Sequence, residues 1–256
     1  MKVLGLQIDI AWENKAANYA KVQAILKNAA PEKGSLVVLP EMFATGFSMN
    51  TGTIAEPYGG ETEAFLAGLA SGFGVYVVGG AAMRAKDARS RNKALCFSPD
   101  GKLVAWYAKM RPFAPGGEAE HYTAGERTAV FQWGECKVSP FVCYDLRFPE
   151  LFRQAAATHR PELFTVIASW PDKRIHHWTR LLQARAIENQ AFVIGVNRIG
   201  NDPFYEYSGQ SAIVDPDGNL IAEAGARETC IQAELDLQNL AKYRTGLPFL
   251  ADMRTD

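Results

Sequence analysis

The feature that most constrains this fold is a series of strands and helices that occurs twice along the chain. Short apolar runs, typical of buried strands, alternate with segments in which apolar residues recur every three or four positions, as in amphipathic helices. Each series ends in a hairpin, and the two hairpins are nearly alike: FSPDGKLVA begins at Phe97 and VDPDGNLIA at Val214. We therefore predict an α/β fold in which two similar halves pack as a sandwich.

The pattern assigns the elements of both halves. The first series predicts helices at 14–30 and 61–73 and strands at 3–10, 35–40, 74–82, 92–98 and 103–109. The second predicts helices at 148–157 and 176–190 and strands at 163–169, 191–197, 208–215 and 219–223. No Pro/Gly/Ser-rich linker separates them, and 256 residues with 48% hydrophobic content suit one core. We predict a single domain spanning residues 1–256.

Composition excludes several classes of partner. The net charge is −1 and the basic residues are spread along the chain, so no surface for nucleic acid or an anionic membrane is indicated. No segment approaches the roughly 18 apolar residues of a membrane-spanning helix, and the first apolar run is too short for a signal peptide. No Cys-x-x-Cys spacing occurs, and Cys96, Cys136 and Cys230 resemble buried thiols. We expect a soluble cytoplasmic protein.

Three reactive side chains come directly after apolar strands. Glu41 follows SLVVLP, Lys109 ends LVAWYAK, and Cys143 follows Pro140–Val142. The carboxyl ends of strands are where an open sheet gathers its reactive groups. Singly, a structural thiol, a solvated glutamate and a surface lysine would be ordinary. Together, a carboxylate, an ammonium and a thiol favour thiol-dependent hydrolysis of a C–N bond.

Each of these residue types has a task in such chemistry. A free cysteine has a pKa of about 8.5, so a base or a positive charge must increase its thiolate population. We expect the sulfur of Cys143 near the N-terminus of the next helix, where the macrodipole favours the thiolate. The four histidines do not lie at equivalent strand ends, so Glu41 is the candidate base. Lys109 and the backbone N–H of Tyr144 can stabilise the oxyanion.

Three segments resemble the signature of the nitrilase superfamily, the carbon–nitrogen hydrolases: LPEMF around Glu41, YAK at Lys109 and CYDLRFPE at Cys143. They occur in the family's order and spacing. The resemblance implies a four-layer α-β-β-α sandwich, a glutamate base, a lysine that stabilises the intermediate, an acylated cysteine and no cofactor. It also implies a second glutamate after the lysine, for which Glu118 is the candidate and Glu120 the alternative.

One departure from the family pattern concerns the loop after the lysine. Many members read His-Leu-Phe there, whereas this chain has Met110–Phe113. The segment 110–127 is also the longest one without strong periodicity, and such loops often form active-site walls. The path of this loop near the pocket is therefore expected to differ from that of its relatives.

The substrate is suggested by a closer resemblance. CYDLRFPE, the segment Ser169–Pro171 and the helix ARAIENQ most resemble the ω-amidase branch. That resemblance implies hydrolysis of short α-keto dicarboxylate monoamides, such as α-ketoglutaramate and α-ketosuccinamate, to the acid and ammonia. The free carboxylate of such a substrate requires a cation or a donor cluster in the pocket.

Several residues could form that pocket, and each has a structural alternative. The candidate cations are Arg111, Arg147 and Arg174, although an ion pair with Asp145 or Glu150 explains Arg147 more simply. The aromatic side chains of Phe43 and Trp170 could wall the pocket, or they could belong to the core.

Other functions remain open at this stage. Within the superfamily the chain could instead hydrolyse N-carbamoyl compounds or nitriles, and a non-catalytic scaffold on this fold is a further alternative. The adjacent His176 and His177 diverge on a helix and cannot share a metal ion, so no metal site is assigned. The resemblance also implies a homodimer or larger homo-oligomer, to which Phe148, Leu151, Phe152 and Phe249 could contribute apolar area. Core packing is the alternative for these four.

Overall fold

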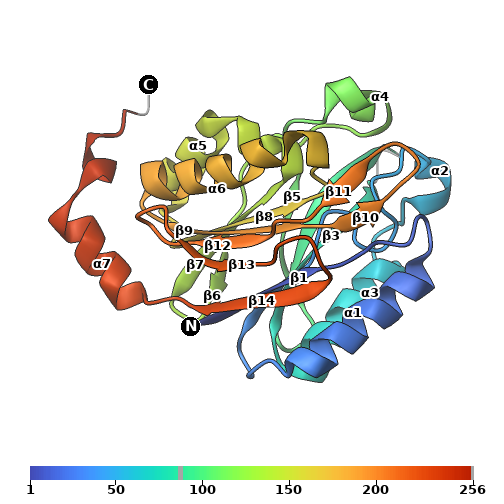
Figure 1. Ribbon diagram of the computed structural model, residues 1–256, viewed down its shortest axis with the longest axis horizontal. Coiled ribbons are helices and arrows are strands. Elements are labelled where there is room, and N and C mark those ends of the chain that lie inside the picture. Colours follow the sequence, from blue (N-terminus) through green and yellow to red (C-terminus); the bar gives the residue numbers. More distant parts are fainter. Residues whose placement is uncertain (86–88, 255–256) are drawn as a thin grey trace.

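Two six-stranded sheets form the centre of the computed structural model, which describes residues 1–85 and 89–254 (Figure 1). The first sheet has the order β14-β1-β2-β3-β4-β5 and the second β13-β12-β9-β8-β7-β6. The strands of the first sheet are β1 (Lys2–Gln7), β2 (Leu36–Val38), β3 (Tyr76–Arg84), β4 (Ser90–Phe97), β5 (Leu103–Ala108) and β14 (Thr229–Glu234). Those of the second are β6 (Phe131–Trp133), β7 (Cys136–Val142), β8 (Leu163–Ala168), β9 (Phe192–Asn197), β12 (Ala212–Val214) and β13 (Leu220–Glu223).

The two sheets repeat one connection pattern. Strands β1, β2 and β3 are parallel and are joined by α1 (Lys15–Ala29) and α3 (Glu61–Phe73), and β3, β4 and β5 then form antiparallel pairs. Strands β7, β8 and β9 are likewise parallel, joined by α5 (Pro149–His159) and α6 (Ile175–Asn189), before the antiparallel β12 and β13. The predicted α/β sandwich of two similar halves is confirmed.

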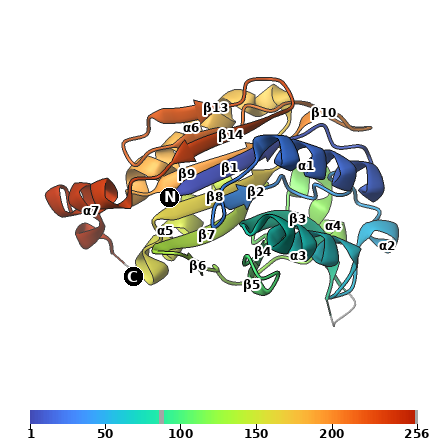
Figure 2. The ribbon, with the colours of Figure 1, turned by 90° about the horizontal axis from the view of Figure 1, so that it is seen from below.

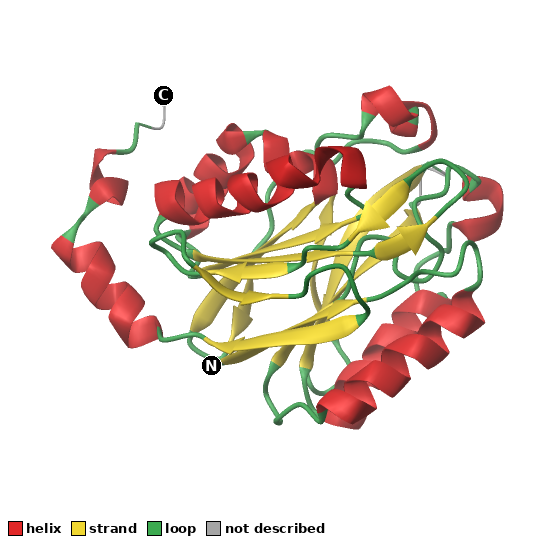
Figure 3. Ribbon diagram, in the orientation of Figure 1, coloured by secondary structure: helices red, strands yellow, loops and turns green. Residues whose placement is uncertain are grey.

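Helices cover the outer faces of both sheets. Figure 2 shows α1 and α3 on the outer face of the first sheet, with α5 and α6 on that of the second, which makes the four layers (Figure 3). Parallel strands covered on both faces are apolar throughout: Leu36–Val38 and Leu163–Ala168 are buried at every position. One cluster of buried side chains fills the space between the sheets, and a second lies under α1 and α3.

Four elements differ from the sequence expectations. Strands β14 and β6 pair antiparallel with β1 and β7, at equivalent edges of the two sheets, and neither was predicted. Helix α7 (Leu237–Gly246) extends beyond the sandwich (Figure 1). Helix α5 begins at Pro149, because a 3₁₀-helix, η2 (Cys143–Arg147), follows the strand first.

The remaining described elements are short: α2 (Thr51–Ile54), α4 (Glu118–His121), β10 (Ile199–Asn201), β11 (Glu206–Ser208), η1 (Ala114–Gly116), η3 (Asp172–Arg174) and η4 (Phe249–Asp252). Among the described helices, none has the length and apolar character needed to span a bilayer. Leu151 and Phe152 belong to the core, whereas Phe249 is half exposed and Phe148 is partly buried. The homo-oligomer stays a prediction.

The end of β2 packs closely against the neighbouring strand β3. A Cβ atom on Gly80 would lie 2.4 Å from the backbone nitrogen of Met42 and 2.6 Å from the Cα of Glu41. Both neighbours are backbone atoms and cannot rotate away. Only glycine at this position therefore allows the chain after β2 to place Glu41 where it does.

We expect Gly80→Ala to displace the Glu41 backbone, to lower the free energy of unfolding by about 1 to 3 kcal/mol and to reduce activity. The matched control is Gly68→Ala in α3, where a Cβ atom meets nothing within 4 Å. That change should instead stabilise the helix by up to about 1 kcal/mol. Urea unfolding of both variants measures the difference, and equal stability of the two would contradict the proposed close contact.

Candidate active site

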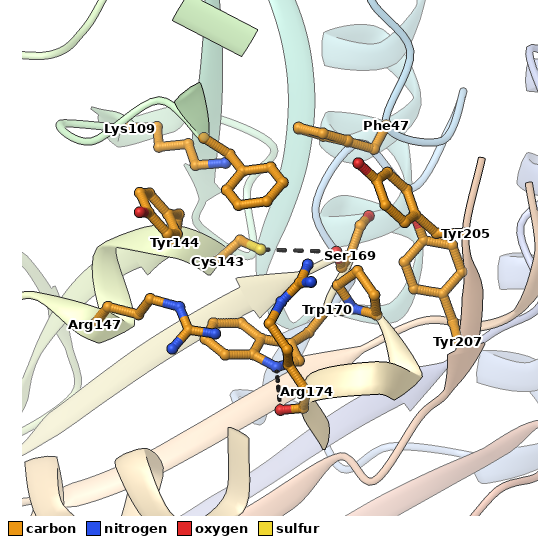
Figure 4. Close-up of a pocket in the computed structure, with 12 residues that line it drawn as sticks. Phe47, Lys109, Cys143, Tyr144, Arg147, Ser169, Trp170, Arg174, Tyr205 and Tyr207 are labelled. Atoms are coloured by element: carbon orange, nitrogen blue, oxygen red, sulfur yellow. Dashed lines mark hydrogen bonds between the residues drawn. The ribbon is translucent and has the colours of Figure 1, made fainter. Parts of the chain in front are cut away.

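Glu41, Lys109 and Cys143 meet at one edge of the sandwich, although they are far apart in sequence. Glu41 follows β2, Lys109 directly follows β5 and Cys143 directly follows β7. Strand β3 is parallel to β2. Because β3 pairs antiparallel with β4, and β4 pairs antiparallel with β5, strand β5 is also parallel to β2. The carboxyl ends of β2 and β5 therefore lie at the same edge of the sandwich. Strands β5 and β7 contact each other across the sandwich, which brings the second sheet's thiol beside the first sheet's lysine (Figure 4).

The ammonium of Lys109 lies between two buried carboxylates. Its Nζ donates to Oε1 of Glu41 at 2.9 Å and to Oε2 of Glu118 at 2.7 Å, and all three side chains are buried. Burial alone would lower the pKa of Lys109, but the charges of Glu118 and Glu41 outweigh it and raise that pKa well above its ordinary value. The lysine therefore stays cationic throughout the neutral range.

Asn92 completes this network from strand β4. Its Nδ2 donates to Oε1 of Glu41 at 2.7 Å and to Oε1 of Glu118 at 2.9 Å. Backbone N–H groups also donate to both carboxylates: that of Ser169 to Oε2 of Glu41 at 2.8 Å, and that of Phe113 to Oε2 of Glu118 at 2.6 Å. Each carboxylate thus receives the donors that a buried charge requires.

Glu118 and Glu120, the two candidates for the second glutamate, occupy different environments. Glu118 begins α4 and is fully buried beside Lys109, whereas Glu120 is exposed. The same short helix carries Tyr122 at its end, and the hydroxyl of Tyr122 donates to the carbonyl of Ser48 at 2.7 Å. Hydrogen bonds of Phe113, before Glu118, and of Tyr122, after it, therefore hold the loop that follows Lys109.

Cys143 has a backbone conformation that presents its sulfur to the pocket. Its φ is 48°, in the left-handed region that non-glycine residues adopt at a cost. Burial and the charge of Glu41 raise the pKa of Cys143 well above its ordinary value, and the charge of Lys109 opposes them. The expected stabilisation of a thiolate by the helix macrodipole is not observed, because η2 rather than α5 follows the sulfur. The resting group is a thiol that needs a base.

Asp145 connects the lysine-bearing segment to the cysteine-bearing segment. Its Oδ1 accepts from the backbone N–H of Arg111 at 2.8 Å. Its Oδ2 accepts from the hydroxyl of Tyr107 at 2.8 Å and from the N–H of Val142 at 3.2 Å. Burial raises the pKa of Asp145 to about 7, while Lys109 and these donors oppose the rise. The Asp145 side chain thus links the segment around Lys109, through Tyr107 and Arg111, to Val142, the residue before Cys143.

The pocket at the sulfur is lined by aromatic and cationic side chains (Figure 4). The aromatic walls are Phe47, Phe113, Tyr144, Trp170, Tyr205 and Tyr207. Trp170 is held by its backbone N–H, which donates to Oδ1 of Asn197, and by its Nε1, which donates to the carbonyl of Arg174. Phe43 does not line the pocket: it packs against Tyr19 and Phe65 in the core, because α1 and α3 cover that face.

Two of the three candidate arginines face this pocket. Arg147 lies over the ring of Trp170 at 4.5 Å from its centroid, and Arg174 lies 5.5 Å from that of Phe113. The ion pair expected for Arg147 does not form, because Tyr107 and backbone N–H groups occupy Asp145 and Arg111 takes Glu150 at 3.5 Å. Burial and the charge of Arg174 lower the pKa of Arg147.

Neither guanidinium that faces the pocket forms an ion pair with a carboxylate among residues 1–85 and 89–254. Arg147 instead contacts the Nδ1 of His177 at 3.2 Å, and Figure 4 shows the guanidinium of Arg174 directed toward Cys143 and Ser169. In the described part of the chain, no group of His, Cys, Asp and Glu side chains has an arrangement that could hold a metal ion.

The sequence did not point to Asn92, to the backbone of Ser169 or to the tyrosines of the β10–β11 hairpin. Asn92 shares its face of β4 with Ala94 and Cys96, which belong to the core between the sheets. A polar residue on a buried face of a strand is the signal that could have identified it. Tyr205 and Tyr207 reach the pocket from a distant hairpin, and local sequence carries no signal for that contact.

Known proteins resemble this chain both in sequence and in structure. Residues 3–245 match the sequence profile described as carbon-nitrogen hydrolase. The chain is 34% identical to the 2-oxoglutaramate amidase of Bacillus subtilis and 36% identical to the ω-amidase YafV of Yersinia enterocolitica, covering 98% of this chain and 96% of each relative. XC1258 from Xanthomonas campestris, solved with an arsenic adduct in its active site, superposes with a TM-score of 0.94 at 33% identity, covering 100% of this chain and 98% of that one.

We expect Asp145→Asn to lower kcat by about tenfold to a hundredfold. Both oxygens of Asp145 accept hydrogen bonds, and the amide would replace one of these acceptors with an N–H₂ donor that faces another donor. The KM should change less, because Asp145 does not line the pocket. The control is the exposed Asp172→Asn in η3, which should behave as the parent protein. Steady-state kinetics of both variants tests this, and an unchanged kcat in Asp145→Asn would show that Asp145 does not position the catalytic segments.

Proposed function

The chain belongs to the carbon–nitrogen hydrolase family of the nitrilase superfamily and is a hydrolase of non-peptide C–N bonds, and from this we propose that it is an ω-amidase. Its substrates are short α-keto dicarboxylate monoamides, such as α-ketoglutaramate and α-ketosuccinamate. Water converts the terminal amide to a carboxylic acid, and ammonia leaves. Glu41, Lys109 and Cys143 carry the reaction, with Glu118 as a fourth catalytic-site residue.

The first half-reaction forms a thioester. Glu41 takes the thiol proton of Cys143, and the sulfur attacks the amide carbonyl carbon. The carbonyl oxygen becomes an oxyanion, which Lys109 and the backbone N–H of Tyr144 stabilise. When the C–N bond breaks, Glu41 returns the proton to the leaving nitrogen and ammonia departs. The raised pKa of the thiol supports this order, because the resting sulfur must lose a proton before it can attack.

The second half-reaction hydrolyses the thioester with the same groups. Glu41, again ionised, takes a proton from water, and the hydroxide attacks the acyl carbon. The C–S bond then breaks, the acid leaves, and the proton on Glu41 restores the thiol. Glu118 takes no proton in this scheme. Together with Glu41 it holds Lys109 cationic, and through the N–H of Phe113 it shapes the pocket wall.

The observation that carries the substrate class is the pair of arginines beside the thiol. Two guanidinium groups line one small pocket, and their like charges disfavour each other. A ligand carboxylate supplies the opposite charge and matches the fork of a guanidinium. We assign Arg147 and Arg174 to the substrate's free carboxylate and the walls of Trp170 and Phe47 to its carbon chain. Arg111 is paired with Glu150 and is assigned no contact.

We expect the purified protein to release ammonia steadily from α-ketoglutaramate, and Cys143→Ala to abolish this release while leaving the protein folded. The substrate panel includes a carbamoyl amino acid and an aliphatic nitrile, which should yield no ammonia. A coupled ammonia assay measures turnover, and thermal unfolding checks the fold of the variant. Turnover that survives the substitution would refute the mechanism, and a preference for the carbamoyl substrate would refute the assigned specificity.

The role of the arginines predicts a selective loss of affinity. Arg174→Met should raise the KM for α-ketoglutaramate by about tenfold to a hundredfold, the value of a lost charge-assisted hydrogen bond. Slow turnover of butanamide, which has no carboxylate, should change little. Arg111→Met is the matched control and should leave both substrates unaffected. If Arg174→Met slowed both substrates equally, the guanidinium would serve the fold or the chemistry and not the carboxylate.

A further inference from the structure

Lys93 is a buried cation on strand β4. It is 1% exposed and lies on the outer face of β4. Its Nζ donates to the hydroxyl of Tyr58 at 2.7 Å and lies 3.8 Å from the ring centroid of Trp106. Among residues 1–85 and 89–254, no carboxylate forms an ion pair with it.

These contacts leave the ammonium incompletely satisfied. An ammonium group has three N–H donors, and the hydroxyl of Tyr58 accepts only one of them. The faces of Trp106 and Tyr58 attract the charge but are weak substitutes for an anion. A charge removed from water without a full set of partners destabilises the folded protein. Lys93 therefore has the capacity to bind one more acceptor.

Lys93 lines a cavity of about 410 Å³. Among the residues that the structure describes, its charged lining consists of Arg91, Lys93 and Arg127 with one acidic residue, Glu126. Trp106 and Tyr58, each almost half exposed, form apolar walls beside the charges. The size lies within the usual range for small-molecule sites, and a few convergent polar groups on an apolar lining are typical of them.

We propose that this cavity is a second ligand site, which binds a small oxyanion, carboxylate or phosphate, against Lys93. The anion accepts hydrogen bonds from the ammonium of Lys93 and from the guanidinium of Arg127, and Trp106 and Tyr58 contact its carbon part. Free inorganic phosphate and a small organic carboxylate share this chemistry, so the experiment has one arm for each.

The proposed site is separate from the catalytic pocket but adjoins the catalytic backbone. Side chains alternate across a strand, so Asn92 contacts Glu41 on the inner face of β4 while Lys93 lies on the outer face. Lys93 is paired in register with Ala108, the residue before Lys109, and the N–H of Gly125 in the cavity wall donates to the Lys109 carbonyl. The two pockets have no charged side chain in common.

The test measures binding with the catalytic pocket disabled, because Arg147 and Arg174 would also bind a carboxylate. Full-length Arg147→Met/Arg174→Met protein is titrated by calorimetry with benzoate in one arm and with inorganic phosphate in the other. We expect one site per chain with a dissociation constant of about 1 mM or tighter for at least one probe. The probe that binds more tightly, benzoate or inorganic phosphate, identifies whether the site prefers a carboxylate or a phosphate. Absence of binding in both arms would overturn the proposal.

Two further substitutions in that background locate the site. Lys93→Met, which keeps the volume of the side chain, should weaken binding about tenfold or more, and Arg127→Gln, an exposed change, should weaken it less. Lys102→Met is the matched control, because this exposed lysine pairs with Asp100 and should not affect binding. Thermal unfolding confirms that each variant is folded. Binding that is unaffected by both Lys93→Met and Arg127→Gln would place the anion elsewhere and overturn the proposal.

Discussion

Two carboxylates around one buried ammonium are the interaction on which the arrangement of this site depends. Burial disfavours the charge of Lys109, and Glu41 and Glu118 offset that cost, while Lys109 and Asn92 supply hydrogen-bond donors to both buried carboxylates. The four side chains of this network come from the ends of β2 and β5, from α4 and from the inner face of β4. The network therefore forms only when the first sheet is complete and the loop after β5 has docked.

The reactive residues were predictable because their signals are local. An apolar strand that ends on a charged residue or a thiol is visible in the sequence, and Glu41, Lys109 and Cys143 all have this pattern. The doubled series of strands and helices was predictable for the same reason, because buried parallel strands and amphipathic helices differ in period. Glu118 has a weaker local signal, and the sequence favoured it over Glu120 only through a family resemblance; in the structure Glu118 is buried and Glu120 is exposed.

The supporting residues were not predictable, because their roles depend on contacts between distant segments. Asn92 acts through the register of β4 against β5, and Asp145 through the approach of the β5 and β7 segments. Phe43 was placed wrongly: two positions after Glu41 it was expected to form a pocket wall, yet Met42 has a left-handed backbone that turns the chain, and Phe43 lies in the core. Strand β14 pairs with β1 from the other end of the chain, and no local pattern specifies that partner.

The charges around the thiol also decide when it is deprotonated. The charge of Arg147 interacts favourably with a thiolate at Cys143, since opposite charges stabilise each other. A bound substrate carboxylate neutralises the arginines and removes that support just when the sulfur must attack. Burial and the charge of Glu41 then act against the thiolate, with Lys109 left to oppose them. Proton transfer to Glu41 coupled to attack on the amide avoids a free thiolate altogether.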